Sequence, residues 1–269
     1  MNPISAIRKL VKVIFRLPPI RWYRISKYRR QFITARGWQG LHYGIYGSFE
    51  QARAAVPAKV AGWLPDDDDW YTSQYQKIEI IDYPILFWLQ RLIKPGSTLF
   101  DFGGHVGVSY RKYASYLDYP SDFRWIVCEQ DSVVEKAQAL HEKSGEPHLS
   151  FDTDFKQAAM ASIFHSAGCI QYVEQPLASM LAELETLPQH LILSKVPLYK
   201  QPTKVTLQNT GYSISPNWLF NRELFIEDIC HLGYELIDAW PCPGRRNYIR
   251  FHPEYNVEQM SGLYFQKKN

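Results

Sequence analysis

The sequence contains no uninterrupted run of about 18 apolar residues, so no transmembrane helix is expected. Basic residues interrupt the apolar ones near the start and no small-residue cleavage site follows, so no secretory signal is indicated. Cysteine is scarce, and no Cys-x-x-Cys pair exists to form a zinc or redox motif. The contiguous aspartates at 66–69 lack the alternate spacing of a calcium loop. We therefore expect no bound metal and a location in the reducing cytoplasm.

Acidic residues are missing from the start of the chain, where the first one is Glu50. Residues 1–36 carry ten basic residues, whereas the remainder holds 27 acidic residues against 20 basic ones. We interpret residues 1–36 as a basic arm, and this asymmetry favours contact with an anionic surface. Apolar residues at helical spacing over 4–17 predict a basic amphipathic helix that ends at Pro18-Pro19.

Two partners are open for this arm. Trp22, Tyr23 and Tyr28 mixed with basic residues suit the interface of an anionic membrane, so residues 1–30 are candidates for peripheral contact at its inner face. Alternatively, the helix packs its apolar face on the rest of the protein. Nucleic acid is not an expected partner, because no nucleic-acid-binding motif accompanies the basic residues.

Residues 37–94 are predicted to form an N-terminal extension that is helical and rich in aromatic residues. Glycine and aromatic residues alternate over 37–57, which predicts a loop that either lines a cleft or packs locally. Within it, Ser48-Phe49-Glu50-Gln51 reads as a capping box that starts a short helix. The apolar spacing over 70–92 predicts a second helix, kinked or divided by Pro84.

A glycine-rich stretch follows the break at Lys94-Pro95-Gly96. The apolar residues of Leu99–Phe102 predict a buried strand that carries Asp101 near its end. The glycines of Gly103–Gly107 then allow a sharp turn and close approach of a ligand, before a helix that begins at Val108. The spacing is not the G-x-G-x-x-G of dinucleotide-binding proteins, which disfavours a nicotinamide-dependent oxidoreductase.

A second acidic residue, Glu129, follows the next predicted strand over 123–128. Because ligands of open α/β sheets bind beyond the carboxyl ends of the strands, Glu129 is placed to accept both hydroxyls of a ribose. Asp152 ends a third predicted strand and is a weaker candidate, since an aspartate there also caps helices.

Strands continue to alternate with helices along the rest of the chain, which predicts a doubly wound α/β sheet. Residues 165–172 are expected to hold the end of the fourth strand and the loop that follows it. A turn-rich polar section is expected after the fifth strand, up to about residue 217. The last two strands are expected over 234–240 and 262–266, with no long helix between them.

The run from Asp101 to Gly107 resembles the first motif of class I S-adenosylmethionine-dependent methyltransferases, and Glu129 resembles their second motif. His105 stands where a further glycine is common. The resemblance implies a Rossmann-like, doubly wound, seven-stranded and mostly parallel sheet over residues 95–269, preceded by the N-terminal helical extension. It implies that the last two strands pair antiparallel. It also implies S-adenosylmethionine as cofactor and methyl transfer as activity.

More narrowly, the chain resembles a branch of uncharacterised methyltransferase-like proteins associated with surface-polysaccharide loci. This resemblance rests on Cys128-Glu129-Gln130, Ile170-Gln171-Tyr172 and Gly233-Tyr234-Glu235-Leu236, and it implies a sugar or another small-molecule or glycan acceptor. Ser194-Lys195-Val196-Pro197 departs from the Arg-Thr-Pro-like pattern of that branch. The alternative is a protein of the same fold that has lost transfer activity and serves as a binding scaffold at a membrane.

The resemblance also assigns roles within the site. Backbone groups of the glycine turn would bind the methionine part of the cofactor, Asp101 would face its ammonium group, and Glu129 would bind the ribose diol. The loop expected over 165–172 would face the methyl group and supply a base, with His165 and Tyr172 as candidates. The expected cofactor-binding residues are Asp101, Phe102, Gly103, Gly104, His105, Gly107, Glu129, Gln130, Asp152 and Ser166.

Overall fold

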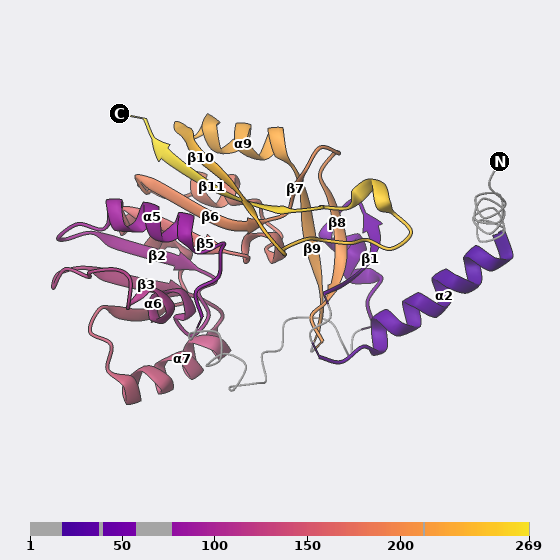
Figure 1. Cartoon of the computed structure of the whole chain (residues 1–269), viewed down its shortest axis with the longest axis horizontal. Helices are drawn as coiled ribbons and strands as arrows, with labels where there is room; N and C mark the ends of the chain where they lie inside the picture. Colours follow the sequence, from indigo (N-terminus) through magenta and orange to yellow (C-terminus); the bar gives the residue numbers. More distant parts are fainter. Residues whose placement is uncertain (1–17, 38–39, 58–76, 212, 269) are drawn as a thin grey trace, which may run out of the picture.

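A computed structural model describes residues 18–37, 40–57, 77–211 and 213–268. Two β-sheets organise this part of the chain, one of seven strands and one of four (Figure 1). The amphipathic helix expected over 4–17 and the aspartates at 66–69 lie outside the described residues. None of the described helices is long and apolar enough to cross a membrane.

The seven-stranded sheet has the order β10-β11-β6-β5-β2-β3-β4. Its five strands from β6 to β4 are parallel, whereas β11 lies antiparallel between β6 and β10. This order confirms the expected Rossmann-like, mostly parallel sheet of class I methyltransferase type, including its antiparallel last pair. The strands are β2 (Thr98–Phe102), β3 (Arg124–Cys128), β4 (Leu149–Asp152), β5 (Ile163–Ala167), β6 (His190–Val196), β10 (Tyr234–Cys242) and β11 (Met260–Lys267).

Helices cover both faces of this sheet, because successive residues of each buried strand point to opposite sides. Leu99 and Ile163 face a core that includes residues of α5 and α6, whereas Phe100 and Phe164 face a second core shared with α8 and α9. These buried strands are apolar on both faces, as parallel strands between helices require. The helices are α5 (Tyr83–Leu92), α6 (Val108–Tyr113), α7 (Asp131–Ser144), α8 (Leu177–Ala182) and α9 (Arg222–His231), with 3-10 turns η3 (Phe155–Met160), η4 (Ile170–Tyr172) and η5 (Pro253–Tyr255).

The start of α5 corrects the expected helix over 70–92. Residues 77–82 are not helical, and α5 begins at Tyr83 with Pro84 in its first turn. Proline fits there because the first helical residues need no backbone N–H donor. Pro84 therefore starts this helix and does not kink it.

The four-stranded sheet was not anticipated. Its order is β1-β8-β9-β7, and β1 pairs antiparallel with β8. The expected loop over 37–57 is wrong where it covers β1. The expected polar section up to about 217 is wrong where it covers β7, β8 and the first half of β9. These strands are β1 (Leu41–Tyr46), β7 (Leu198–Tyr199), β8 (Lys204–Asn209) and β9 (Ile214–Asn221).

The polar residues of β8 explain that error. Val205 and Leu207 pack in an apolar cluster, while Thr206 and Gln208 on the opposite face are equally buried. A strand whose polar face is also buried looks, in sequence, like a solvated segment. The four-stranded sheet also joins two predicted regions of the chain. Strand β1 lies in the predicted N-terminal extension, residues 37–94, and β8 lies in the predicted catalytic domain, residues 95–269.

Helix α2 (Pro18–Thr34) lies against this sheet at one end and projects from the body at the other (Figure 1). Near its carboxyl end, Tyr28 and Phe32 are buried, and the Tyr28 hydroxyl donates to the backbone oxygen of His42 at 2.8 Å. Near its start, Trp22 and Tyr23 are 76% and 67% exposed.

The capping box at the next helix, α3 (Phe49–Ala54), is confirmed. Ser48 Oγ accepts the backbone N–H of Gln51, and Gln51 Oε1 accepts the N–H of Gly47.

Candidate active site

The turn after β2 adopts left-handed backbone conformations at three positions. Gly103 has φ 74°, His105 has φ 58° and Gly107 has φ 81°. At Gly103, a Cβ atom would overlap the side chain of Cys169, so this position requires glycine for space as well as conformation. His105 adopts the same region with a side chain, which is strained and explains why glycine is common at this point of the motif. Its Nδ1 accepts the N–H of Val106 at 2.8 Å.

Asp101 is buried at the carboxyl end of β2, with 1% of its surface exposed. Its Oδ2 accepts the indole N–H of Trp125 at 3.1 Å, and a Cβ on Gly104 would overlap the carboxylate. Its Oδ1 has no hydrogen-bond partner in the described part of the chain. Burial raises the pKa of Asp101 to about 7, against the lowering effect of the Trp125 hydrogen bond. A buried carboxylate with an unused oxygen beside a glycine turn suits a cationic ligand group.

Glu129 ties the turn to the end of the neighbouring strand. Its Oε1 accepts the N–H of His105 and its Oε2 accepts the N–H of Gln130, both at 3.2 Å. Strands β2 and β3 are paired in parallel up to Phe102 and Cys128, so the carboxylates of Asp101 and Glu129 lie at the same edge of the sheet. Burial raises the pKa of Glu129, while these two hydrogen bonds lower it. Each carboxylate oxygen retains capacity for a further donor, such as a ribose hydroxyl.

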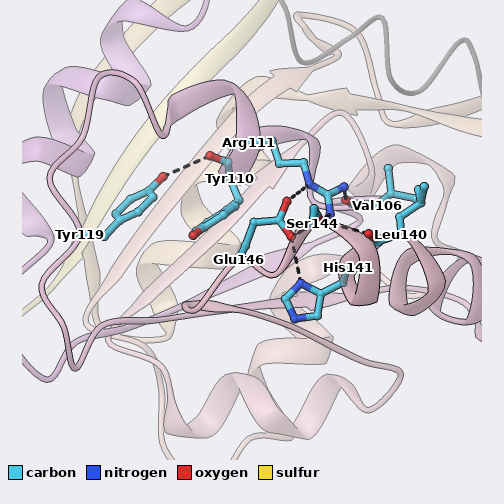
Figure 2. Close-up of polar contacts among 8 residues, drawn as sticks. All are labelled: Val106, Tyr110, Arg111, Tyr119, Leu140, His141, Ser144 and Glu146. Carbon is cyan, nitrogen blue, oxygen red and sulfur yellow. Dashed lines mark hydrogen bonds and ion pairs between the residues drawn. The ribbon is translucent and has the colours of Figure 1, made fainter.

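An ion-pair cluster anchors the helices that follow the turn (Figure 2). Arg111 of α6 donates to the backbone oxygen of Val106 and, through Nε, to Glu146 Oε1, each at 2.6 Å. The other oxygen of Glu146 accepts from Ser144 at 2.6 Å and lies 3.0 Å from His141 Nδ1. Partial burial acts to raise the pKa of Glu146, but the bonds from Arg111, Ser144 and His141 bring it down to about 2. The cluster thus fixes one end of the turn to α7.

The remaining candidates for cofactor contact have local partners. Ser166 is buried, and its hydroxyl donates to the backbone oxygen of Phe102 at 2.9 Å. Asp152 Oδ1 accepts the N–H groups of Thr153 and Asp154, the local bonding that an aspartate makes in a turn. Gln130 is exposed at the start of α7. Their contact with a cofactor remains a prediction.

The sequence predicted that the two candidate bases share a loop, but in the structure they do not. His165 lies inside β5, fully buried, and its Nδ1 is 3.1 Å from the backbone oxygen of Ile192. Burial lowers the pKa of His165 to about 4. Tyr172 ends η4, and its hydroxyl donates to Gln208 Oε1 at 2.7 Å. Residues 165–167 are the end of the strand that was expected to finish within 165–172. The placement of His165 in the loop is wrong, because its pairing with β2 and β6 holds it in the sheet.

A group of buried amides was missed by the sequence analysis. Asn217 Nδ2 donates to Gln208 Oε1 at 2.9 Å, and Asn247 Nδ2 donates to Asn217 Oδ1 at 3.3 Å. We call Tyr172, Gln208, Asn217 and Asn247 the inner polar cluster. Asn247 Oδ1 and the nearby Gln171 Oε1 have no partner among the described residues. Polar residues alternating with apolar ones over 204–209 were the available signal, but the section was interpreted as turns.

Comparison with known proteins finds similarity to solved structures only. The sequence matches no protein-family profile and no curated protein. The structure is similar to 1,6-didemethyltoxoflavin-N1-methyltransferase of Burkholderia thailandensis, solved with S-adenosylhomocysteine, with 14% identity over 78% of this chain and 94% of that chain and a TM-score of 0.48.

Two other solved structures are S-adenosylmethionine-dependent methyltransferases. The one from Aquifex aeolicus shows 10% identity over 76% of this chain and 100% of that one, with a TM-score of 0.48. The one from Mesorhizobium loti shows 12% identity over 70% and 98%, with a TM-score of 0.47. At these values, the similarity assigns no activity and no residue role to this chain.

Proposed function

We propose that the protein is an S-adenosylmethionine-dependent methyltransferase. The observation that carries the proposal is a pair of carboxylates, the buried Asp101 and the half-buried Glu129, at adjacent strand ends on either side of a left-handed glycine turn. Asp101 Oδ1 has no partner among the described residues, and Gly104 has no side chain beside this carboxylate. The carboxylate oxygen is therefore a hydrogen-bond acceptor next to backbone without a side chain. This pair of carboxylates suits a ligand with an ammonium group and a diol, because neither carboxylate can bind the negative charge of a phosphate.

Each residue of the turn then has a distinct task. Asp101 holds the ammonium group of the cofactor, Glu129 accepts the hydroxyls of its ribose, and the backbone of the turn lies along the methionine part. The bound cofactor supplies a methyl group on a sulfonium, which is transferred to a nucleophile by in-line displacement. The protein contributes chiefly orientation and exclusion of water, and a base where the acceptor must lose a proton.

The acceptor is proposed to be a hydroxyl group of a sugar or another small-molecule or glycan intermediate. The support lies at the inner polar cluster and Gln171, where the amide oxygens of Asn247 and Gln171 lack a partner among the described residues and can accept the O–H of a hydroxylated molecule. These amide groups lie on or next to η4, β8 and β9. We call these elements, with the end of β6, the acceptor side, and we call the turn with the ends of β2 and β3 the cofactor side.

The exposed part of α2 supports a peripheral contact with an anionic membrane. The helix contains no acidic residue, and Trp22 and Tyr23 are exposed beside Arg21 and Lys27. Replacing Trp22 and Tyr23 by serine is expected to reduce sedimentation of the full chain with phosphatidylserine vesicles at least fivefold. Tyr28 and Phe32 must stay, because they are buried against the second sheet; unchanged sedimentation of the double variant would exclude this contact.

Calorimetric titration with S-adenosylhomocysteine tests the cofactor site directly. We expect saturable binding at one site per chain, and a folded sample that binds neither this compound nor S-adenosylmethionine would refute the proposal. Incubation with trideuteromethyl-labelled S-adenosylmethionine and a polar cell extract then tests transfer, read by mass spectrometry as a gain of a CD3 group. Binding without transfer would favour the second candidate function, a scaffold of this fold. The full burial of His165 and the engaged hydroxyl of Tyr172 are the observations that favour that candidate.

A further inference from the structure

Strand β6 contains a bulge at its carboxyl end, on the acceptor side. Leu193 pairs with Leu263 and Val196 pairs with Ser261, so two residues of β6, Ser194 and Lys195, stand opposite one residue of β11. Lys195 adopts a left-handed conformation, with φ 56°. Bulges of this kind redirect a side chain and are common beside active sites. A left-handed lysine in a central strand is strained, which indicates that its orientation has a use.

The side chain of Lys195 lies over the end of the adjacent strand. Gly168 follows β5 and donates its N–H to the backbone oxygen of Ser194 at 2.9 Å. A Cβ on Gly168 would lie 3.3 Å from Lys195 Cδ, so the lysine chain passes over the space that this glycine leaves open. The charge of Lys195 influences the pKa of both Asp101, near the end of β2, and His165, in β5.

Nearby carboxylates are already engaged with other cations. Asp82 binds Lys112 Nζ at 2.5 Å and accepts the Tyr113 hydroxyl at 2.9 Å. Glu79 binds Arg245 at 2.5 Å. In the described part of the chain, Lys195 Nζ has neither an ion pair nor a hydrogen bond of its own.

The surroundings of Lys195 favour its neutral form. Burial lowers the pKa of Lys195, and the positive charges of Arg245 and Lys112 lower it further, while Asp82 and Glu79 oppose them. The two candidates from sequence are less suitable as bases, since His165 is enclosed in the sheet and the Tyr172 hydroxyl donates to Gln208.

We propose that Lys195 is the catalytic base, whose neutral amine takes the proton of the acceptor hydroxyl as that oxygen attacks the methyl group. The inference rests on the proposed function. In this step the O–C bond forms, the C–S bond breaks with its electron pair remaining on sulfur, and the O–H proton moves to Nζ. The resulting ammonium releases its proton to water after the methylated product leaves, so the step requires no further reactant.

Three variants of the full chain test this role. Lys195→Met removes the amine, Lys195→Arg keeps the charge but cannot deprotonate, and Lys200→Met removes an exposed lysine just beyond β7 as matched control. The assay follows CD3 transfer to the polar cell extract, and titration with S-adenosylhomocysteine reports that each variant is folded. We expect both Lys195 variants to lose at least 100-fold in rate at pH 7 with cofactor affinity within twofold, and Lys200→Met to match the wild type.

The pH profile of the wild type is the second measurement. Its rate is expected to rise about tenfold per pH unit until the amine is neutral and then to level off. A wild-type rate for Lys195→Arg would show that only charge is needed and would overturn the proposal, as would a wild-type rate that falls as the pH rises. A wild type that binds the cofactor but transfers nothing overturns the proposed function itself, whereas transfer by wild type and Lys195→Met alike overturns only the role of Lys195.

Discussion

The cofactor side of the site is made of segments that follow one another closely, whereas the acceptor side is assembled from distant parts of the chain. Asp101, the glycine turn and Glu129 lie within 30 residues of sequence and on neighbouring parallel strands. On the acceptor side, the Thr206 hydroxyl donates to the backbone oxygen of Gly44, 162 positions away, and Asn217 contacts Asn247. The first side is specified by a local motif. The second is specified by burial, through hydrogen bonds that no local pattern reveals.

The largest effect is expected from adding one methyl group to the cofactor side. Gly103→Ala places Cβ in the left-handed region and against the Cys169 side chain, and should lower the free energy of unfolding by about 4 kcal/mol. The matched control is Gly145→Ala, at φ 67° with no atom near the new Cβ, which should lose only about 1–2 kcal/mol. Equal losses in urea unfolding would mean that the turn is not closely packed.

Acid should lower the free energy of unfolding through the protonation of Glu146, which anchors one end of the glycine turn. Its pKa of about 2 in the folded protein lies below its ordinary value of 4.5. The stabilisation is therefore complete above about pH 4.5 and is lost as the pH falls toward 2, for a total of up to about 3 kcal/mol. Urea unfolding at pH 7 and pH 3 measures it. Glu146→Gln should be less stable at pH 7 and should change less between the two pH values; a parallel fall in both proteins would place the acid sensitivity elsewhere.

Glu129→Ala is expected to weaken binding of S-adenosylhomocysteine 30- to 100-fold while the fold persists, because it removes the proposed acceptor of the ribose hydroxyls. Calorimetric titration measures this change. Glu142→Ala, which alters an exposed glutamate on α7, serves as control and should bind like the wild type. Unchanged affinity of Glu129→Ala would remove this residue from the cofactor side.

The smallest effect is expected on the acceptor side, from Asn217→Ala. The change leaves the Asn247 amide without its acceptor and should cost about 2 kcal/mol of stability. Because Asn217 lies in the four-stranded sheet, away from β2 and β3, the affinity for S-adenosylhomocysteine should stay within twofold of wild type. A large loss of affinity would show that the acceptor side and the cofactor side are energetically coupled.

The same contrast explains what the sequence could predict. The strand ends at Asp101 and Glu129 were recognisable because an apolar run, an acid and glycines occur in fixed order. The late antiparallel pair was expected from the resemblance to methyltransferases. The four-stranded sheet was not recognisable, since Thr206 and Gln208 are polar and yet buried. Lys195 was visible only as a departure from a pattern, because its conformation depends on a bulge set by pairing with β11.

The pairing of β1 with β8 also means that the four-stranded sheet cannot form until β8 has been synthesised. Leu41 pairs with Asn209, so β1 leaves the ribosome well before its partner strand exists. At 5–20 residues per second, translation of the intervening chain takes about 10–30 s. Until then β1 is an unpaired edge that exposes Tyr43 and Tyr46 to other chains. Slow translation or truncation before residue 209 should therefore favour aggregation, which makes this strand the segment most in need of protection while the chain is incomplete.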